Sequence, residues 1–541
     1  MGEADSFFKP GQRGPPPPQH YREEEYPLQP YQQQQQQQPY TDQHHPGGYS
    51  TADYHAAYGA PPPYSFNPPQ ASDEKYSYDD AFRIEKPKYH DAWAGILLIL
   101  VFAGYVAISA IVLRGYITGR SGSGIDHGND FSLNSNTIVL FACCLIVAFI
   151  LSLAYVWMAR VFTRLFIWAT GILNIAWALG TSIFYLYRAQ WSAGIVFLVF
   201  AIFFAFAFWT WIPRIPFSAL MLKTSVDVSR KHGHVYLVSF IGGLIATAMA
   251  AWFSVTLVAI YVTYQPSRNN PKCGNDGSGC GHGLVIGLVA YVTFAMYWIT
   301  EWLKNTVHTT VAGVYGSWYF SPHNLPRGAT RGAARRALTY SFGSISLGSL
   351  LVAILQFLRQ VCSVIRDQGA AQGGLGSIVA DIVFCILGCL LSLMEWAVQF
   401  INRYAFVHIA LYGKGYIGAA KDTWRMVKDR GIDALVNDCL IGPVFSFGAL
   451  FIAFACALFA YLYLLFTDPA YNHTGGFTAV VMAYAFLIGF QIAHVFTTPL
   501  SSGIDTIFVA AGWDPQVMMR DHPELYNEMG RVYPKIHEAI H

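Results

Sequence analysis

The sequence predicts an all-α polytopic membrane protein with about ten transmembrane helices and a disordered N-terminal tail. Of its 541 residues, 54% are hydrophobic and 12% are charged, whereas about a quarter of the residues in an ordinary soluble domain are charged. From residue 92 onward, apolar runs recur that are each long enough to cross a hydrocarbon core of about 30 Å as a helix. The net charge of +2 supplies no long-range field that would attract a nucleic acid.

The predicted cytosolic tail, residues 1–90, is rich in Pro, Gln and Tyr. It holds 15 of the 27 prolines and a tract of seven glutamines, Gln32 to Gln38. Such a segment has too little apolar surface to offset the entropy cost of ordering, which predicts disorder. No apolar run follows Met1, so we expect no cleaved signal peptide, and we expect the first span to act as the insertion signal.

Residues 91–510 are predicted to form a ten-span transmembrane domain, and residues 511–541 a cytosolic C-terminal tail. The fifth and ninth apolar runs are long enough to tilt or to project beyond the bilayer. The sixth and eighth runs also contain acidic residues. The runs cover approximately residues 92–113, 137–158, 166–187, 194–212, 236–264, 284–306, 338–361, 379–401, 438–466 and 477–499.

Lys and Arg in the loops predict the orientation of these spans. The loops that follow even-numbered spans hold 16 of these basic residues, and the loops that follow odd-numbered spans hold six. Loops with an excess of Lys and Arg stay in the cytosol. Both termini are therefore expected on the cytosolic side.

One internal loop, residues 214–234, has an amphipathic helical pattern. Phe217, Leu220, Met221 and Val228 fall near one helical stripe, and the basic residues fall elsewhere. Such a helix lies either along the inner membrane interface or against the cytosolic ends of the spans. The pattern leaves both alternatives open.

Two external loops carry features of an oxidising, extracellular environment. Cys273 and Cys280 flank a Gly-rich stretch that lets the chain turn back, which predicts a disulfide, with two free thiols as the alternative. Asn472 begins the sequence Asn-His-Thr, an acceptor for N-linked glycosylation. Both features fit a protein that passes through the secretory pathway.

Polar residues share one face of the sixth span. Trp298, Glu301, Trp302, Asn305 and His308 recur at helical spacing, so an acid, two indoles and two further polar groups line a single surface. An ionisable group at membrane depth is costly and generally lines a cavity or pairs within the bundle. This face is therefore predicted to look into the bundle.

The eighth span repeats the pattern with Glu395, Trp396, Gln399 and Asn402. Both spans run from outside to inside, and both acids lie at a similar distance from the external start, so we expect them at one depth. A quaternary or alkylated ammonium cannot donate ordinary hydrogen bonds and is held by aromatic faces and a nearby negative charge. The two spans thus predict a site for an organic cation.

A structural role is the alternative for these residues. Glu301 then pairs only with Lys304, Glu395 pairs with Arg403, and the Trp rings form an interfacial belt. Weaker candidates are single polar residues of the kind that often only join helices, namely Asn174, Gln491 and His494.

Small residues predict close packing and helix breaks. In the fifth span, Ser239, Gly243, Thr247 and Ala251 form a ridge with small side chains every four residues, which predicts close helix packing. Broken helices are common at transport sites. Glycines that predict breaks after the sixth and eighth spans are Gly313, Gly316 and Gly415.

The sequence lacks the motifs of familiar enzymes. It contains no phosphate-binding loop, nucleophile elbow or HExxH motif, and no Cys and His spacing typical of a zinc site. We therefore expect no enzyme, no cofactor and no metal, and a solute would move through a channel, a facilitator or an ion-coupled carrier. An intramembrane enzyme that uses His308 or His494 has only these lone histidines to support it.

The tail contains a short interaction motif. Pro61, Pro62, Pro63 and Tyr64 match the P-P-x-Y form that WW domains bind in an aromatic groove. The motif predicts a WW-domain ubiquitin ligase as a partner that controls surface abundance, and a chance match in a Pro-rich segment is the alternative.

Three segments resemble the choline transporter-like family. They are residues 304–320 (KNTVHTTVAGVYGSWYF), residues 336–344 (RALTYSFGS), and residues 402–405 (NRYA) leading into 409–414 (IALYGK). The tail is similar to that of the fungal, pH-nine-sensitive branch of the family. The resemblance covers essentially residues 90–525.

This resemblance implies a ten-span plasma-membrane transporter with cytosolic termini, and animal members take up choline without sodium. The expected function is facilitative uptake of choline or a similar small organic cation. The alternative is a non-transporting membrane scaffold whose tail recruits partners.

Overall fold

The computed structural model describes residues 88–119, 135–189, 191–264, 282–322, 326, 328–370, 375–429, 441–467 and 478–532. Several predictions lie outside these residues and stay predictions. They concern residues 1–87 of the predicted disordered tail, the Cys273–Cys280 disulfide, glycosylation of Asn472, and the motif with Pro61, Pro62 and Tyr64.

Every regular element in the described part of the chain is a helix, which confirms the all-α fold class. Long apolar segments favour helices in lipid because each helix satisfies its own backbone hydrogen bonds. The elements are α2 (Ala92–Gly119), α3 (Ser135–Val161), α4 (Thr163–Tyr187), α5 (Trp191–Trp211), the 3-10 helix η2 (Ile212–Arg214), α6 (Ile215–Lys231), α7 (His234–Tyr264), α8 (His282–Phe320), α9 (Ala329–Leu338), α10 (Phe342–Ala370), α11 (Leu375–Tyr412), α12 (Tyr416–Asp429), α14 (Ile441–Thr467), α15 (Thr478–Trp513), α16 (Pro515–Asp521) and α17 (Pro523–Val532).

Ten of these helices coincide with the ten predicted spans. Among the described residues, nine helices are long and apolar enough to cross a membrane. The fourth predicted span lies in α5, which meets the following helix at a bend of 46°, and this pair counts as a tenth span if the two parts are taken together.

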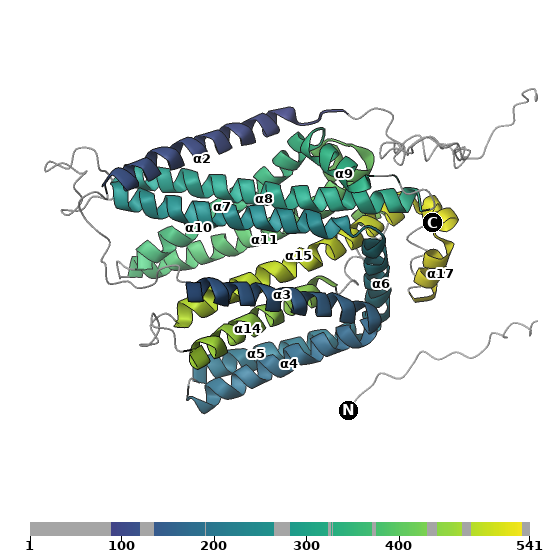
Figure 1. The fold of residues 1–541 in the computed structure, drawn as a ribbon, viewed down its shortest axis with the longest axis horizontal. Helices are drawn as coiled ribbons and strands as arrows, with labels where there is room; N and C mark the ends of the chain where they lie inside the picture. The colour runs from purple at the N-terminus through teal and green to yellow at the C-terminus, as the bar shows by residue number, and fades with distance from the viewer. Residues whose placement is uncertain are drawn as a thin grey trace, which may run out of the picture. The chain divides into compact units, whose positions relative to one another are not determined.

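Helix α8 lies at the centre of the bundle and packs against α7, α10, α11 and α15 (Figure 1). It has 39 residues, α11 has 38 and α15 has 36, whereas about 20 residues cross a hydrocarbon core. These three helices therefore extend past the membrane, at the end of the bundle where α6, α9 and α17 also lie.

Helix α6 occupies residues 215–231, within the loop that has the amphipathic pattern, and runs across the ends of the spans (Figure 1). Phe217, Met221 and Val228 are buried, and α6 contacts α3, α4, α15 and α17. Of the two alternatives, the structure therefore shows a helix packed on the spans. The apolar stripe of α6 is covered by protein.

The predicted close packing of small residues in α7 is confirmed for Ser239, which is buried, and for Gly243, where a Cβ would lie 2.9 Å from a methyl group of Val495 in α15. Thr247 and Ala251 are exposed, so this half of the ridge does not pack against another helix in the described part of the chain.

The predicted break at Gly313 and Gly316 is wrong, because α8 continues unbroken to Phe320. The break after the eighth span is present in residues 413–415, where Gly413 has a φ of 61°. Packing around this part of α8 keeps Gly313 and Gly316 helical.

Replacing Gly503 by alanine is expected to destabilise the fold, because a Cβ there would lie 2.2 Å from the ring of the buried Tyr315. Overpacking of this kind costs about 1–3 kcal/mol. The matched control is Gly418→Ala in α12, where nothing lies within 4 Å of the added Cβ and alanine favours the helix by up to about 1 kcal/mol. Thermal unfolding of the purified protein in detergent measures both, and equal effects would contradict the packing shown here.

Candidate functional site

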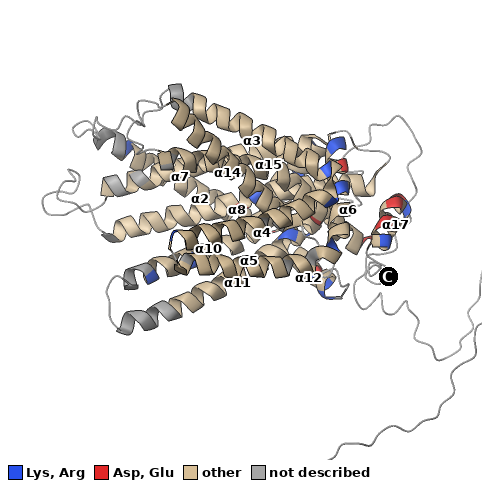
Figure 2. Cartoon of the chain, turned by 90° about the horizontal axis from the view of Figure 1, so that it is seen from below, with Lys and Arg blue, Asp and Glu red and all other residues tan. Residues whose placement is uncertain are grey.

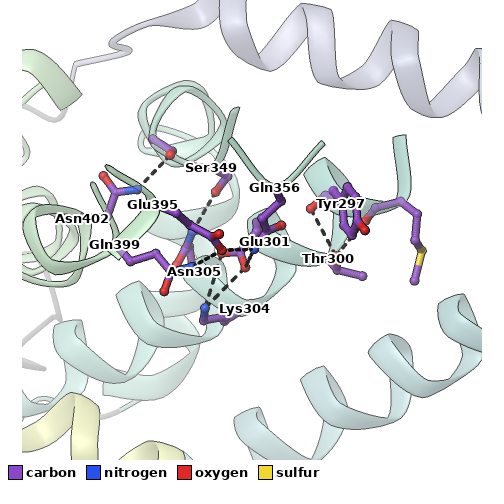
Figure 3. A network of polar contacts seen from close by, with 12 residues as sticks. Tyr297, Thr300, Glu301, Lys304, Asn305, Ser349, Gln356, Glu395, Gln399 and Asn402 are labelled. Carbon is purple, nitrogen blue, oxygen red and sulfur yellow. Dashed lines mark hydrogen bonds and ion pairs between the residues drawn. The ribbon is translucent and has the colours of Figure 1, made fainter. Parts of the chain in front are cut away.

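Two buried carboxylates lie side by side between α8, α10 and α11. The side-chain amide of Gln356 in α10 donates to Glu301 Oε1 of α8 and to Glu395 Oε1 of α11, each over 3.2 Å (Figure 3). Gln399 donates a further hydrogen bond of 3.1 Å to Glu395 Oε1. Both glutamates are buried. The two acids therefore lie at one level, as expected, because both contact the same side chain of Gln356.

Each carboxylate also has a basic partner at the edge of the cluster. Lys304 Nζ lies 3.4 Å from both carboxylate oxygens of Glu301, and Arg359 lies 3.1 Å from Glu395 Oε2. The side chain of Lys304 is 61% exposed and that of Arg359 is 49% exposed, whereas the acids are 12% and 9% exposed. Glu301 thus pairs with Lys304, as the structural alternative predicts, but it also accepts from Gln356. Glu395 pairs with Arg359, so its predicted pairing with Arg403 is wrong.

A layer of hydrogen bonds to α10 positions the helices that carry the acids. Asn305 donates to Ser349 Oγ over 2.9 Å, and Asn402 donates to the carbonyl oxygen of Gly348 over 2.8 Å (Figure 3). Tyr416 of α12 donates its hydroxyl to Asn402 Oδ1, and burial raises the pKa of this tyrosine to about 12. The hydroxyl therefore stays protonated and keeps donating its hydrogen bond to Asn402.

The four predicted tryptophan and histidine positions lie in different surroundings. Trp298 is fully buried and donates its indole N–H to the carbonyl oxygen of Ser346 over 3.0 Å. Trp302 packs edge-on against Phe342, with ring centroids 5.4 Å apart. Trp396 is 64% exposed on the outer surface. The structure thus brings Trp298 and Trp302 to the α8–α10 interface and leaves Trp396 outside the cluster.

His308 belongs to a second polar cluster, between α8, α11 and α15. Its Nε2 lies 2.8 Å from the carbonyl oxygen of Arg403, and its Nδ1 lies 2.8 Å from Ser502 Oγ. A carbonyl oxygen only accepts, so Nε2 carries a proton. The guanidinium of Arg403 pairs with Asp505, whose side chain is 2% exposed, and donates to Ser501 Oγ.

Sequence reasoning missed Gln356, Arg359 and Asp505. Gln356 and Arg359 stand one helical turn apart in the seventh span, and such polar residues within an apolar run face protein or a cavity rather than lipid. Asp505 follows the tenth predicted span, in the part of α15 that continues beyond it. The two polar residues within the seventh apolar run could have revealed Gln356 and Arg359, whereas Asp505 lies outside every predicted span.

A groove opens beside the carboxylates, between α10 and α11. Its volume, counted to its open mouth, is about 970 Å³. Arg359 lines the groove and also pairs with Glu395, so the groove reaches the cluster. The other lining residues are Gln360, Cys362, Ser363, Arg366, Phe384, Cys385, Gly388, Cys389 and Ser392.

Of the weaker candidates, Gln491 and His494 make contacts between or within helices. Gln491 donates to the carbonyl oxygen of Gly243 over 3.4 Å, and the ring of His494 packs against Phe490 at 4.5 Å. The side chain of Asn174 lies outside the described residues. In the part of the chain that the structure describes, no three His, Cys, Asp or Glu side chains are placed to hold a metal ion.

Comparison with known proteins places these features in a family. The model of a family described as plasma-membrane choline transporter matches residues 195–516, a range that includes Glu301, Gln356 and Glu395. Protein PNS1 of Gibberella zeae is 64% identical over 472 residues, which cover 87% of each chain. Protein pns1 of Aspergillus fumigatus is 57% identical over 488 residues, 89% of this chain and 90% of the relative.

A more distant relative extends the likeness to yeast. Protein PNS1 of Saccharomyces cerevisiae is 38% identical over 469 residues, 85% of this chain and 87% of the relative. The family model covers more than half of the chain, and the relatives are matched over most of their length. The chain therefore belongs to the plasma-membrane choline transporter family, a family of multi-pass membrane transporters.

Proposed function

We propose that the protein is a facilitative carrier of the plasma membrane for choline or a similar small organic cation. The observation that carries this proposal is the pair of buried carboxylates, Glu301 and Glu395, joined by Gln356. Buried acids at membrane depth are costly, and they mark substrate or ion pathways when they face a cavity. Trp298 and Trp302 stand beside Glu301 on α8 and supply aromatic surface.

The basic partners suggest how a cation enters. Lys304 lies 3.4 Å from Glu301, longer than the 2.7–2.9 Å that is typical of a charge-assisted hydrogen bond. Its ammonium is mostly exposed, so little free energy holds it in place. A substrate ammonium takes over the carboxylate as Lys304 swings away, and the cluster stays neutral in both states.

Facilitated transport then needs access to the cluster from both sides in turn. The groove between α10 and α11 gives one path as far as Arg359. Helices α8 and α11 carry one acid each and continue past the membrane on the side of the basic loops. A relative movement of these helices against α10 would open the other path, because Gln356 of α10 joins both acids.

Labelling of a cysteine at position 399 tests this proposal. Gln399 contacts Glu395, so we expect Gln399→Cys to react with trimethylammonioethyl methanethiosulfonate, a reagent with the headgroup of choline, and choline to slow the reaction. Cys362, Cys385 and Cys389 line the groove and are first changed to serine. Peptide mapping by mass spectrometry identifies the labelled cysteine.

The matched control is Leu393→Cys, six residues before position 399 on α11. Leu393 is 61% exposed on the apolar outer surface of α11 and is expected to face lipid and to stay unlabelled. Absence of labelling at position 399, from either side of the membrane, would count against a transport path and favour the membrane scaffold.

We also propose that the tail regulates surface abundance through the P-P-x-Y motif, with both termini in the cytosol as the basic loops indicate. Tyr64→Ala removes the ring that a WW domain binds. We expect the ligase-dependent loss of the protein from the cell surface to become slower in this variant. Surface biotinylation followed over time measures it, with Tyr58→Ala as the control, and an unaltered surface half-life would exclude the motif.

A further inference from the structure

Helix α12 presents a stripe of apolar and basic side chains on its outer side. Ile417 and Trp424 are each 59% exposed, and three exposed basic residues accompany them, namely Lys421, Arg425 and Lys428. Each residue turns a helix by about 100°, so these positions fall on one side of α12, with the apolar pair along one edge and the bases along the other. Exposed apolar groups beside bases are typical of a helix that lies at a membrane interface.

The opposite side of α12 is fixed against the bundle, where the helix packs against α11 and α10. Lys414 precedes α12 and pairs with Asp422 over 2.6 Å, and its ammonium also lies 4.4 Å from the ring centroid of Trp513 in α15. The buried residues of this side are Tyr416, Ala419, Thr423 and Met426. These contacts hold the helix in one rotation about its axis, with the stripe facing outward.

The start of α12 lies at the level where two membrane spans begin. The apolar spans of α2 and α10 begin at Ala92 and Phe342. Asp91 directly precedes α2, and its Oδ2 accepts hydrogen bonds from Ser344 Oγ of α10 over 2.7 Å and from the backbone N–H of Tyr416 over 2.8 Å. One carboxylate thus joins the ends of two spans to the first residue of α12, so this helix begins at the surface of the membrane.

The charge of the stripe fits the anionic side of a membrane. Figure 2 shows that Lys and Arg gather at the end of the bundle where α6, α12 and α17 lie, and the loop count assigns this end to the cytosol. In the part of the chain that the structure describes, Lys421 and Lys428 pair with no acidic side chain. Arg425 lies 3.8 Å from Asp422 and is 60% exposed, so this pair is weak. The three bases are therefore available to a negatively charged surface.

We propose that the exposed stripe of α12 binds anionic phospholipids of the cytosolic leaflet. Trp424 and Ile417 enter the interfacial layer, where indole rings are favoured. The stems of the three basic side chains run along apolar surface while their charged ends reach the lipid headgroups. An acidic protein would also attract these bases, but the membrane surface is already where Asp91 anchors the helix. The inference does not depend on which solute the protein carries.

Photo-crosslinking of the full-length protein in nanodiscs tests this proposal. The probes are phosphatidylserine and phosphatidylcholine that each carry a photoreactive diazirine near the headgroup end of one acyl chain. Each probe is added in equal amount to separate nanodiscs of unlabelled phosphatidylcholine, and peptide mapping by mass spectrometry finds the lipid adducts. We expect adducts on α12 to be at least about tenfold more frequent with phosphatidylserine, because each basic residue near an anionic surface strengthens binding about fivefold.

Paired substitutions locate the binding. Lys421→Gln/Lys428→Gln removes two exposed bases and is expected to lower the phosphatidylserine adducts on α12 at least about tenfold. Lys421→Arg/Lys428→Arg keeps both charges and should keep the adducts. The matched control is Arg230→Gln/Lys231→Gln, which removes the same charge from two exposed positions at the end of α6 and should leave the adducts on α12 unchanged.

Three results would overturn the proposal. The first is equal labelling of α12 by the two lipids, and the second is a loss of labelling in the α6 control as large as that in Lys421→Gln/Lys428→Gln. The third is the absence of adducts on α12 with either lipid. In that case, an amine-reactive crosslink between the Lys421 side chains of two copies would identify a second chain as the partner of the stripe.

Discussion

Glu301→Gln is expected to lower the uptake of choline at least about tenfold, which corresponds to a loss of about 1.4 kcal/mol of interaction with the substrate cation. The substitution removes the negative charge and keeps the shape, and the new amide still has an oxygen that accepts from Gln356. The amount of protein at the cell surface should therefore stay the same. Uptake of radiolabelled choline by cells, corrected for surface protein, measures the effect.

Lys304→Gln is the matched control for this variant. It removes the basic partner of Glu301, an exposed residue that competes with the substrate in our account. Uptake by Lys304→Gln is expected to persist, with an equal or lower KM. If Glu301 and Lys304 form only a structural ion pair, the two variants should behave alike, and uptake that is unchanged in Glu301→Gln would refute the role of this acid.

Arg403→Gln is expected to destabilise the protein by about 3 kcal/mol, because it leaves the buried carboxylate of Asp505 without its basic partner. Asp505 is 2% exposed and pairs with Arg403, which also donates to Ser501. Together these contacts tie α11 to α15. Thermal unfolding in detergent measures the change, with the loss of monodisperse protein in gel filtration as the readout.

The double variant Arg403→Gln/Asp505→Asn distinguishes loss of the pair from general damage. Removing both charges leaves no buried ion alone, so the double variant is expected to be more stable than Arg403→Gln. Arg359→Gln offers a comparison at the other cluster, where Glu395 keeps the hydrogen bonds from Gln356 and Gln399 and the loss should be smaller. A double variant less stable than Arg403→Gln would contradict the buried pairing.

The sequence predicted the helices well because the physical constraint on each is simple. An apolar run must match the thickness of the membrane, and this fixed the number and approximate position of the spans. The sequence could not show that α8, α11 and α15 continue past the membrane. Their added turns are less apolar and are stabilised by packing against α6, α9 and α16, which depends on the folded chain.

The candidate site was predicted only in part, since helical faces show direction but not partners. Glu301 and Glu395 were expected at one depth, and Gln356 joins them. Trp396 follows Glu395 directly, and one residue turns a helix by about 100°, so its ring points outward. His308 shares a face with Glu301 but lies two turns along α8, about 10 Å away, and contacts α11 and α15 instead.

Uptake of radiolabelled choline into sealed vesicles that contain only the purified protein is the direct test of whether this protein transports choline. We expect saturable uptake above that of empty vesicles, without ATP, and we expect excess unlabelled choline to suppress it. Vesicles that hold correctly folded protein and take up no more choline than empty vesicles would contradict the account.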